Sequence, residues 1–384
     1  MFHRVLIVGG TFDRENGRSS GLIAKMGKSI AKAVMSVDDF TKISVEVQNG
    51  GNIERLKELL SETLENDFVF WFANVSNKEE KIRDVKSVAP HTLLITSKRN
   101  DYVDEECIKQ KYDFEELLQR ALAIKANLCF EFCKLPSGVF RMKVFDPLGC
   151  VWYEGTEIDD AAKAAVDRLI YLLSVTRKAS VHTDDVPEVV FNETDKRFLE
   201  FVKSSADVFH RLMCLPADVK RFVGNASLRF KVPTRCMNGF PAVRKDGYVL
   251  ISRRNVDKTG ISEKDFVPCF LDDDGNVAFG GENKPSVDSP VQLRLFKELP
   301  NIDYILHGHC YVKGAPMTSL AIPCGAVEEV AETIHCIKDC YNTCDGKFYT
   351  VNLKGHGCLI MAGADELDKM FSVEFYVRQL PEHM

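Results

Sequence analysis

The sequence predicts an α/β protein with two domains. The chain of 384 residues is longer than one hydrophobic core usually serves. Its first half alternates short β-branched and aromatic runs with segments of helical periodicity, which is typical of a parallel sheet with helices on both faces. Its second half carries an ordered succession of short motifs around three histidines, which indicates a domain of a different kind.

The first half predicts a doubly wound, Rossmann-like α/β domain. Five short runs rich in β-branched and aromatic residues predict strands, and helical patterns separate them. The predicted strands are residues 5–8, 43–47, 68–72, 92–96 and 128–132, and the predicted helices are residues 20–35, 53–64, 78–88 and 114–125. A hairpin around residues 146–149 and a helix over residues 159–173 close the domain.

A polar segment separates the two predicted domains. Residues 181–194 include Pro187 and show no clear periodicity, so we interpret them as a linker. We therefore expect a first domain over residues 1–180 and a second over residues 195–384.

Composition limits the compartment and the partners. The net charge of −6 and the pI of about 5.9 argue against nucleic-acid and acidic-membrane partners. No apolar run approaches the ~18 residues of a membrane span, and the N-terminus lacks the pattern of a secretory signal. Thirteen cysteines, scattered through the chain, are typical of free thiols in a reducing compartment. We expect a cytoplasmic protein.

The loop after the first predicted strand is a candidate anion site. Ligands of such sheets bind beyond the carboxyl ends of the strands, and backbone N–H groups at a helix N-terminus suit a phosphate. The spacing does not match the G-x-G-x-x-G fingerprint, and a glycine turn needed only to join strand and helix is the alternative. Residues 9–11 read G-G-T and residues 18–21 read R-S-S-G. This pattern resembles the nucleotide-binding start of phosphopantothenoylcysteine synthetases, which implies a nucleotide or another anion as the partner. The candidate residues are Gly9, Gly10, Thr11, Arg18, Ser19 and Ser20.

Three histidines form the candidate metal site. In a strand with a period of two, His307 and His309 project from the same side and form a chelating pair. A third imidazole, His356, lies between two glycines, where the backbone can approach closely. Three neutral nitrogen ligands with open positions are typical of a catalytic metal site, because structural zinc sites use all four ligands. Unrelated surface histidines are the alternative.

The order of motifs around these histidines resembles one superfamily. Residues 224–227 read G-N-A-S, residues 285–288 read P-S-V-D, and the H-G-H and H-G motifs follow. This succession is similar to the G-N-x-S, P-S-x-[ED], H-x-H and H-G pattern of the class II aldolase and adducin superfamily, which includes L-fuculose-phosphate aldolase and L-ribulose-5-phosphate 4-epimerase. The resemblance covers about residues 195–380 and implies an α/β/α domain with a central, mainly antiparallel sheet.

The resemblance implies a metal-dependent mechanism. His307, His309 and His356 would hold a divalent metal, with zinc favoured by three imidazoles and manganese, cobalt or iron left open. The metal would act as a Lewis acid that lowers the cost of an enediolate. Asp288 would transfer the proton that this chemistry requires. Its alternative role is to cap the helix that Pro290 begins.

The sequence departs from the superfamily pattern at the residues that would bind the anionic group of the substrate. The superfamily's phosphate-binding aldolases use two consecutive serines, but the second is Val287 here. Arg253 and Arg254 stand where the family has a small-residue turn, and they either bind a phosphate or carboxylate or form a solvated turn. The candidate substrate-binding residues are Asn225, Ser252, Arg253, Arg254, Ser286 and Tyr311.

The expected function is that of a metal-dependent lyase. The reaction would be aldol cleavage or condensation, or a related decarboxylation, on a small hydroxy-carbonyl compound such as a sugar phosphate. A 4-epimerase is an alternative because Asp288 matches its carboxylate, and a non-catalytic adducin-like binding protein is another. A scaffold has no need of three histidines and a carboxylate at an open site, which favours the enzyme. The resemblance also implies a homotetramer with sites between subunits.

Overall fold

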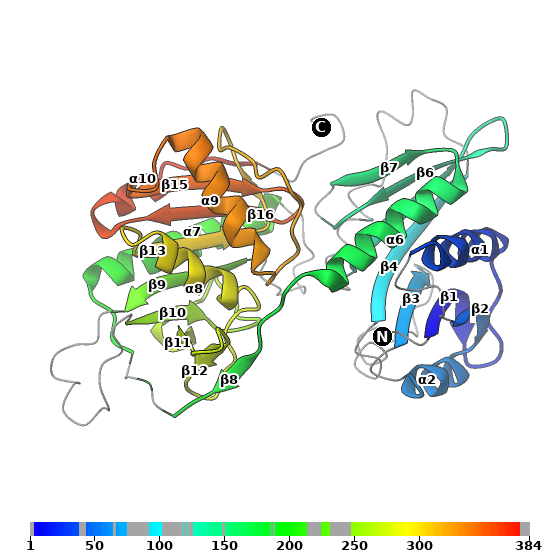
Figure 1. Cartoon of the computed structure of the whole chain (residues 1–384), viewed down its shortest axis with the longest axis horizontal. Coiled ribbons are helices and arrows are strands. Elements are labelled where there is room, and N and C mark those ends of the chain that lie inside the picture. Colours follow the sequence, from blue (N-terminus) through cyan, green and yellow to red (C-terminus); the bar gives the residue numbers. More distant parts are fainter. Residues whose placement is uncertain are drawn as a thin grey trace. The chain divides into compact units, whose positions relative to one another are not determined.

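The computed structural model divides the chain into two compact units, Met1–Leu173 and Ser174–Met384. Figure 1 shows both units, and each is described here by itself. The described residues are 4–37, 44–63, 67–74, 92–101, 117, 121, 126–147, 150–184, 186, 189–212, 224–230 and 247–376.

Unit 1 contains a seven-stranded sheet in the order β2-β1-β3-β4-β5-β6-β7. Strands β1 to β5 pair in parallel, whereas β6 and β7 are antiparallel additions at one edge. The strands are β1 (Arg4–Asp13), β2 (Ser44–Asn52), β3 (Asp67–Asn74), β4 (Thr92–Asp101), β5 (Leu128–Lys134), β6 (Phe140–Phe145) and β7 (Val151–Gly155).

Helices cover both faces of this sheet, as a doubly wound fold requires. In β1, Val5 and Ile7 pack on one face against α1 (Gly21–Met35) and α6 (Ile158–Ser174). Leu6 and Val8 pack on the other face against α2 (Ile53–Ser61). The alternation follows from the period of two of a strand, and the predicted fold class is confirmed.

The predicted elements of unit 1 differ from the structure in detail. The first strand is longer than expected, since β1 continues to Asp13 by pairing with β2 beyond an irregularity in register. The hairpin predicted around residues 146–149 corresponds to the β6–β7 connection. The helix predicted over residues 78–88 lies outside the described residues, and of residues 114–125 only Leu117 and Ala121 are described.

Unit 2 contains an eight-stranded sheet in the order β15-β16-β13-β9-β10-β11-β12-β8. All neighbours are antiparallel except β8, which pairs in parallel with β12. The strands are β8 (Ser180–His182), β9 (Gly224–Phe230), β10 (Tyr248–Ser252), β11 (Phe266–Leu271), β12 (Val277–Phe279), β13 (Tyr304–Gly308), β15 (Phe348–Leu353) and β16 (Gly357–Ala362). A separate pair joins β14 (Tyr311–Val312) to β17 (Phe375–Tyr376).

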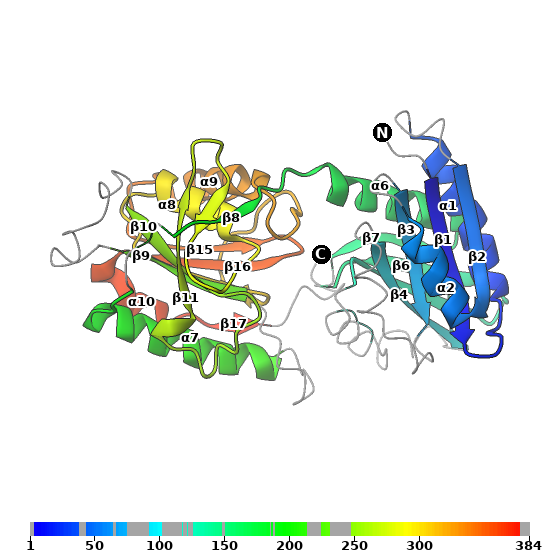
Figure 2. The same ribbon diagram turned by 90° about the horizontal axis from the view of Figure 1, so that it is seen from below.

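The sheet of unit 2 lies between two helical layers (Figure 2). Leu306 of β13 faces α7 (Glu193–Leu212) and α10 (Leu367–Met370), which share one core cluster. Its neighbour Ile305 faces the other cluster, with α8 (Ser289–Glu298) and α9 (Glu328–Tyr341). Short 3-10 turns lie at η3 (Glu263–Asp265) and η4 (Ala364–Glu366). The implied α/β/α arrangement around a mainly antiparallel sheet is confirmed.

The boundary between the units lies earlier in the chain than residues 181–194. Ser180–His182 form β8, whose backbone pairs with Val277–Phe279 in the sheet of unit 2. At the other end of the predicted linker, α7 already begins at Glu193. A three-residue edge strand is too short to show periodicity, which explains why the sequence reads as a linker there.

None of the helices in the described residues combines the length and the apolar composition that a membrane span requires.

Candidate metal centre

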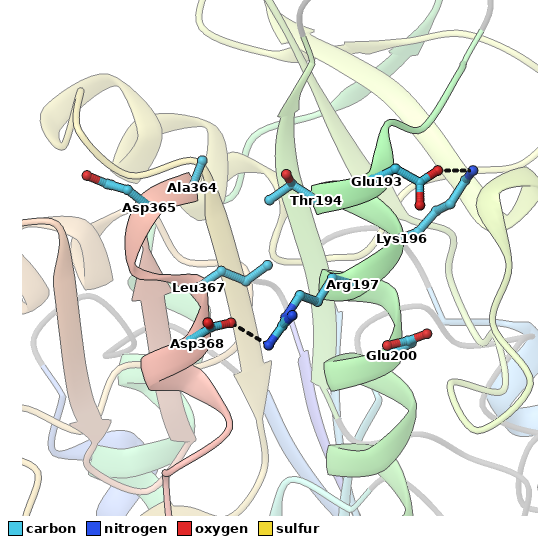
Figure 3. A pocket seen from close by; sticks show the side chains of 9 residues that line it. All are labelled: Glu193, Thr194, Lys196, Arg197, Glu200, Ala364, Asp365, Leu367 and Asp368. Carbon is cyan, nitrogen blue, oxygen red and sulfur yellow. Dashed lines mark hydrogen bonds and ion pairs between the residues drawn. The ribbon is translucent and has the colours of Figure 1, made fainter.

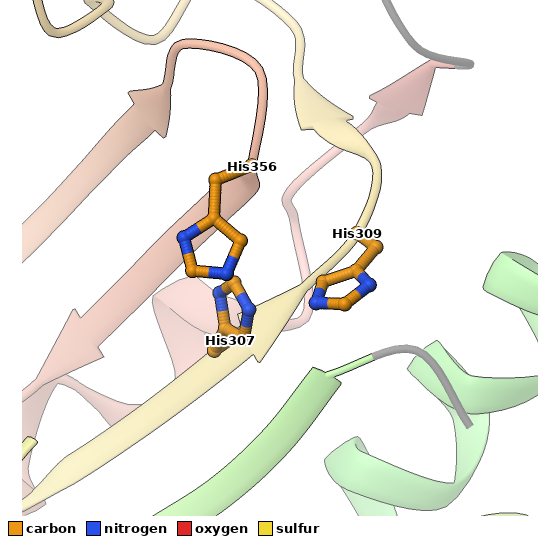
Figure 4. Close-up of side chains that lie close together, drawn as sticks. All are labelled: His307, His309 and His356. Atoms are coloured by element: carbon orange, nitrogen blue, oxygen red, sulfur yellow. The ribbon is translucent and has the colours of Figure 1, made fainter. Parts of the chain in front are cut away.

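Three imidazoles converge at one end of the unit 2 sheet (Figure 4). His307 lies in β13, His309 follows the end of that strand, and His356 lies in the turn between β15 and β16. Antiparallel pairing of β13 with β16 brings this turn beside the two other histidines. Ring centroids are 4.6 Å apart for His307 and His356, 4.9 Å for His307 and His309, and 5.5 Å for His309 and His356. One ligand nitrogen of each lies within 4.8 Å of the others.

Glycines allow the strands beside the histidines to approach closely. Gly224 and Gly357 both have positive φ, at 122° and 136°. A Cβ atom on Gly224 would lie 2.0 Å from the carbonyl oxygen of His307, and one on Gly357 would lie 2.0 Å from that of Gly308. The local geometry of the histidine strand therefore depends on both glycines.

Hydrogen bonds orient two of the imidazoles for metal binding. Nδ1 of His307 donates to the carbonyl oxygen of Cys358 at 3.0 Å, which leaves the lone pair on Nε2. Among the described residues, this buried Nε2 has no hydrogen-bond partner. Nδ1 of His356 lies 2.6 Å from Oε1 of the buried Glu329. Metal-ligating histidines typically donate their second nitrogen to a carbonyl or carboxylate in this way, so the residues fit a divalent cation.

Burial keeps the imidazoles in the form that binds metals. Desolvation lowers the pKa of His307 to about 4 and holds the pKa of His309 well below its usual value. Both rings are therefore neutral at neutral pH, and their lone pairs are available.

The depressed pKa of His307 predicts acid sensitivity of the metal-free protein. Its folded-state pKa lies below the unfolded value of 6.5, so its contribution to stability is present above pH 6.5 and is lost as the pH falls toward 4. We expect this group alone to account for about 3 kcal/mol of unfolding free energy over that range. Urea unfolding of chelator-treated protein at pH 7.5 and 4.5 measures the loss. His307→Gln should reduce the pH dependence of the unfolding free energy, whereas His182→Gln, at an exposed position, should leave it unchanged. The same loss of unfolding free energy in wild type and both variants would contradict the prediction.

Glu329 is expected to strengthen metal binding through His356. Glu329→Gln removes the carboxylate that accepts from Nδ1, and loss of such a partner typically weakens metal affinity by about 10–100-fold. Competition with a chromophoric chelator measures the affinity. The matched control is Glu328→Gln, because the neighbouring Glu328 carboxylate accepts from the backbone of Thr176 instead. Equal affinities for the two variants would refute the positioning role.

Asp288 directs its carboxylate toward the histidines. It occupies the N-cap position of α8, yet its side chain makes no capping hydrogen bond. Oδ2 accepts from Nδ2 of Asn225 at 2.8 Å, Oδ1 accepts from Sγ of Cys324 at 2.8 Å, and Oδ2 lies 3.9 Å from Nε2 of His307. Burial alone would raise the pKa of this carboxyl, but His307, His356 and the hydrogen bonds to it lower that pKa overall. Asp288 is therefore a buried, ionised group beside the imidazoles.

Asn225 and the two serines hold this part of the site together. Nε2 of Gln292 donates to Oδ1 of Asn225, which fixes the amide that donates to Asp288. Oγ of Ser252 accepts from the backbone N–H of Ala226 at 3.1 Å. Oγ of Ser286 accepts from the backbone N–H of Asp288 at 3.3 Å, and the Ser286 N–H donates to the Ser252 carbonyl.

The other candidate substrate residues make contacts within the protein. Nε of Arg253 donates to Asp265 at 2.8 Å, and Nε of Arg254 donates to the carbonyl of Pro285 at 3.3 Å. The hydroxyl of the buried Tyr311 accepts from the N–H of Gly355 and so supports the turn that carries His356. Their roles in substrate binding stay predictions.

Gly9, Gly10 and Thr11 lie in β1 and not in a loop after it, and the segment from them to α1 uses its polar groups internally. Oγ1 of Thr11 accepts from the N–H of Arg18 at 2.7 Å, and the Ser20 hydroxyl caps α1 by accepting from Ile23. A Cβ atom on Gly9 would collide with Ile23, and one on Gly10 would lie 2.7 Å from the backbone nitrogen of Gly50 in β2. These contacts give both glycines a role in packing. Anion binding by this segment, which includes Ser19, stays a prediction.

Three residues near the histidines were missed by sequence reasoning. Glu329 reads as an acidic residue of a helix first turn, and the Ile-Pro-Cys-Gly segment, although part of the motif succession, indicates no role for Cys324. Cys324, Asp288 and His356 nevertheless offer ligand atoms within 4.8 Å of one another. Lys258 lies in the loop after β10 and is 4% exposed. Only the fold brings these residues together.

A surface pocket elsewhere in unit 2 contains no metal-binding histidine. It lies between α7 and the η4–α10 segment, has a volume of about 490 Å³, and is crossed by an ion pair of Arg197 with Asp368 at 2.7 Å (Figure 3). Exposed charges line it rather than buried ligands, so we assign the chemistry to the histidine cluster instead.

Part of unit 2 matches a family model. Residues 208–340 match the model of the Class II Aldolase and Adducin N-terminal domain, a range that contains Asn225, Asp288, His307 and His309. Residues 208–340 therefore carry a Class II Aldolase and Adducin N-terminal domain, and His356 lies beyond the matched range. No curated protein matches the chain.

Solved structures give distant similarities. A DNA/pantothenate metabolism flavoprotein from Streptococcus pneumoniae is 11% identical, with 44% of this chain and 98% of that chain covered and a TM-score of 0.31. YgbL from Escherichia coli, described as a candidate aldolase/epimerase/decarboxylase, is 13% identical over 46% of this chain and 86% of its own, with a TM-score of 0.29. An aldolase II superfamily protein from Pseudomonas syringae is 11% identical over 47% and 72%, with a TM-score of 0.30.

Proposed function

We propose that unit 2 is a metal-dependent lyase that breaks or forms a carbon–carbon bond beside a carbonyl group. The observation that carries the proposal is the convergence of His307, His309 and His356 with the ionised carboxylate of Asp288. The family match supports a class II aldolase-like activity without specifying the reaction.

The three imidazoles would hold the cation. Zinc is the proposed metal, because neutral imidazole nitrogens are among its preferred ligands. Such a cation supplies Lewis-acid polarisation of a carbonyl oxygen and a neighbouring hydroxyl. Because the protein supplies three ligands, further coordination positions of the metal stay open to these two substrate oxygens.

Asp288 is the proposed proton-transfer group. Cleavage of an aldol removes a proton from the hydroxyl of one fragment and delivers a proton to the carbon of the other. An ionised carboxylate can accept the first proton and return it, and Asn225 and Cys324 keep Oδ2 and Oδ1 in place by donating to them. Burial of the carboxylate excludes bulk water from this exchange.

A substrate screen tests the reaction. Zinc-loaded protein would be incubated with sugar phosphates and sugar acids, and the products would be separated by chromatography. The proposal expects cleavage products that disappear after chelation and return with the metal. Formation of an epimer without cleavage would instead identify the 4-epimerase alternative. Cleavage that persists in fully metal-free protein would contradict the mechanism.

Assembly is a separate part of the proposal. The class II aldolase resemblance implies that unit 2 forms a homotetramer with its sites between subunits. Light scattering on the full chain at micromolar concentration tests this, and a monomer would contradict it.

A further inference from the structure

Lys258 is a buried cation for which the described protein provides no direct partner. The residue is 4% exposed. Within the described ranges, its ammonium group makes no ion pair or hydrogen bond. Buried lysines are rare unless they are paired, because an ammonium loses its hydration on burial. A partner supplied by a ligand would compensate for this loss.

Lys258 belongs to the loop that begins where β10 ends, at the same end of the sheet as His307. The backbone N–H of Ser286 donates to the carbonyl of Ser252 at 3.2 Å, so the start of this loop lies beside the segment that leads to Asp288. Val256, two residues before Lys258, is buried in the unit 2 core and anchors the loop.

Lys258 and the ionisable residues of the site shift one another's pKa values. Burial lowers the pKa of Lys258 to about 8, while the nearby carboxylates of Asp257 and Asp288 act to raise it. Lys258 in turn contributes to the lowered pKa values of His307 and His309, which arise mainly from burial. Such reciprocal effects require the ammonium to lie within electrostatic range of both the carboxylate and the imidazoles. At neutral pH the ammonium is predominantly protonated.

Lys258 offers an anionic ligand a buried cation, because its ammonium group has no direct partner within the described ranges. Of the two guanidiniums that the sequence offered for an anion, Arg253 is paired with Asp265, and Nε of Arg254 donates to the carbonyl of Pro285. Lys258 is buried and has no such contact within the described ranges, which makes it the stronger candidate partner for a substrate anion.

We propose that Lys258 is a substrate-binding residue that pairs with an anionic oxygen group, a carboxylate or a phosphate, on the substrate of the metal centre. The inference rests on the proposed function, because it takes the histidine cluster as the place where substrate binds. It narrows the substrate to an acidic hydroxy-carbonyl compound, and it assigns the recognition of that acidic group to a residue outside the superfamily motifs.

Calorimetric titration of two simple anions tests the pairing. Glycolate represents a hydroxy-carboxylate and inorganic phosphate represents a phosphate, and each would be titrated into the full chain, both zinc-loaded and metal-free. Lys258→Met removes the charge at similar volume. Lys264→Met removes the same charge from an exposed position six residues later and is the matched control.

The proposal expects wild-type protein to bind either glycolate or phosphate. The anion that binds shows whether the acidic group of the substrate is a carboxylate or a phosphate. Lys258→Met should weaken that binding by about 30-fold or more, and Lys264→Met should leave it unchanged. Binding of neither anion to the wild type, or equal affinities for wild type and Lys258→Met, would overturn the proposal. If the Met variant does not fold, Lys258→Gln serves in the same test.

Two further readouts separate the possible failures. Zinc content, measured on the same samples, reports on the proposed function. Wild-type protein without zinc would contradict that function. The titrations of metal-free protein would still test the role of Lys258. Thermal unfolding reports on a purely structural role. A structural lysine would change the unfolding temperature of the Lys258 variants and leave their anion affinity at the wild-type value, which would count against the proposal.

Discussion

Replacing Asp288 with asparagine is expected to lower turnover by about 10²–10⁴-fold while leaving the metal and the fold in place. The amide has nearly the same shape as the carboxylate but cannot accept and return a proton. The change breaks no capping hydrogen bond, but both Asp288 oxygens accept hydrogen bonds and the asparagine amide can replace only one of these acceptors, so we expect a loss of about 1–3 kcal/mol of stability in a protein that still folds. Steady-state cleavage, zinc content and thermal unfolding of the variant measure the three effects.

The matched control is Asp195→Asn. Asp195 is also buried, and its Oδ1 accepts from the hydroxyl of Tyr304 at 2.8 Å, away from the histidines. This substitution should affect stability more than turnover. Full activity in Asp288→Asn would end the catalytic assignment of that carboxylate.

Replacing Gly357 with alanine is expected to destabilise unit 2 by at least about 3 kcal/mol and to weaken metal binding. The φ of 136° is unfavourable for alanine. The added Cβ would also lie 2.0 Å from the carbonyl oxygen of Gly308 and 2.9 Å from Cα of His309, so the histidine strand must move. Denaturant unfolding and zinc affinity measure the two losses.

The control variant Gly281→Ala separates the effect of backbone strain from the effect of a steric clash. Gly281 also has a positive φ, at 80°, but a Cβ atom there meets nothing within 4 Å. We expect it to cost about 1–2 kcal/mol and to leave zinc affinity unchanged. If the two glycine variants lost equal stability and retained zinc equally well, the close approach at Gly357 would not matter.

The sequence predicts the sheet of unit 1 well because its strands are long, apolar and regularly spaced. Val5 to Val8 form one unbroken apolar run, and the structure buries alternate members of it against opposite helical layers. The extension of β1 to Asp13 was missed, since it depends on pairing with β2 rather than on local composition. Ser180–His182 were missed as a strand for the same reason.

At the candidate site, the sequence predicts the residues that occur in motifs and misses those placed by tertiary contacts. The H-G-H spacing alone puts two imidazoles on one side of a strand. Glu329 reaches His356 from α9, and Lys258 is buried beside the site by the loop after β10; no spacing rule connects either residue to the histidines. Proline-led helix starts also mislead, because Asp288 has the N-cap position without the capping hydrogen bond.

The most direct test of the metal centre is the metal content of the purified chain. Inductively coupled plasma mass spectrometry after dialysis against zinc, with chelator-treated protein as the blank, measures ions per chain. We expect about one divalent ion per wild-type chain and little or none in His307→Ala, His309→Ala and His356→Ala, because each removes one of the three proposed imidazole ligands. An exposed histidine variant, His335→Ala, should keep the wild-type content. Wild-type protein without a bound ion, or His variants that retain it fully, would contradict the account.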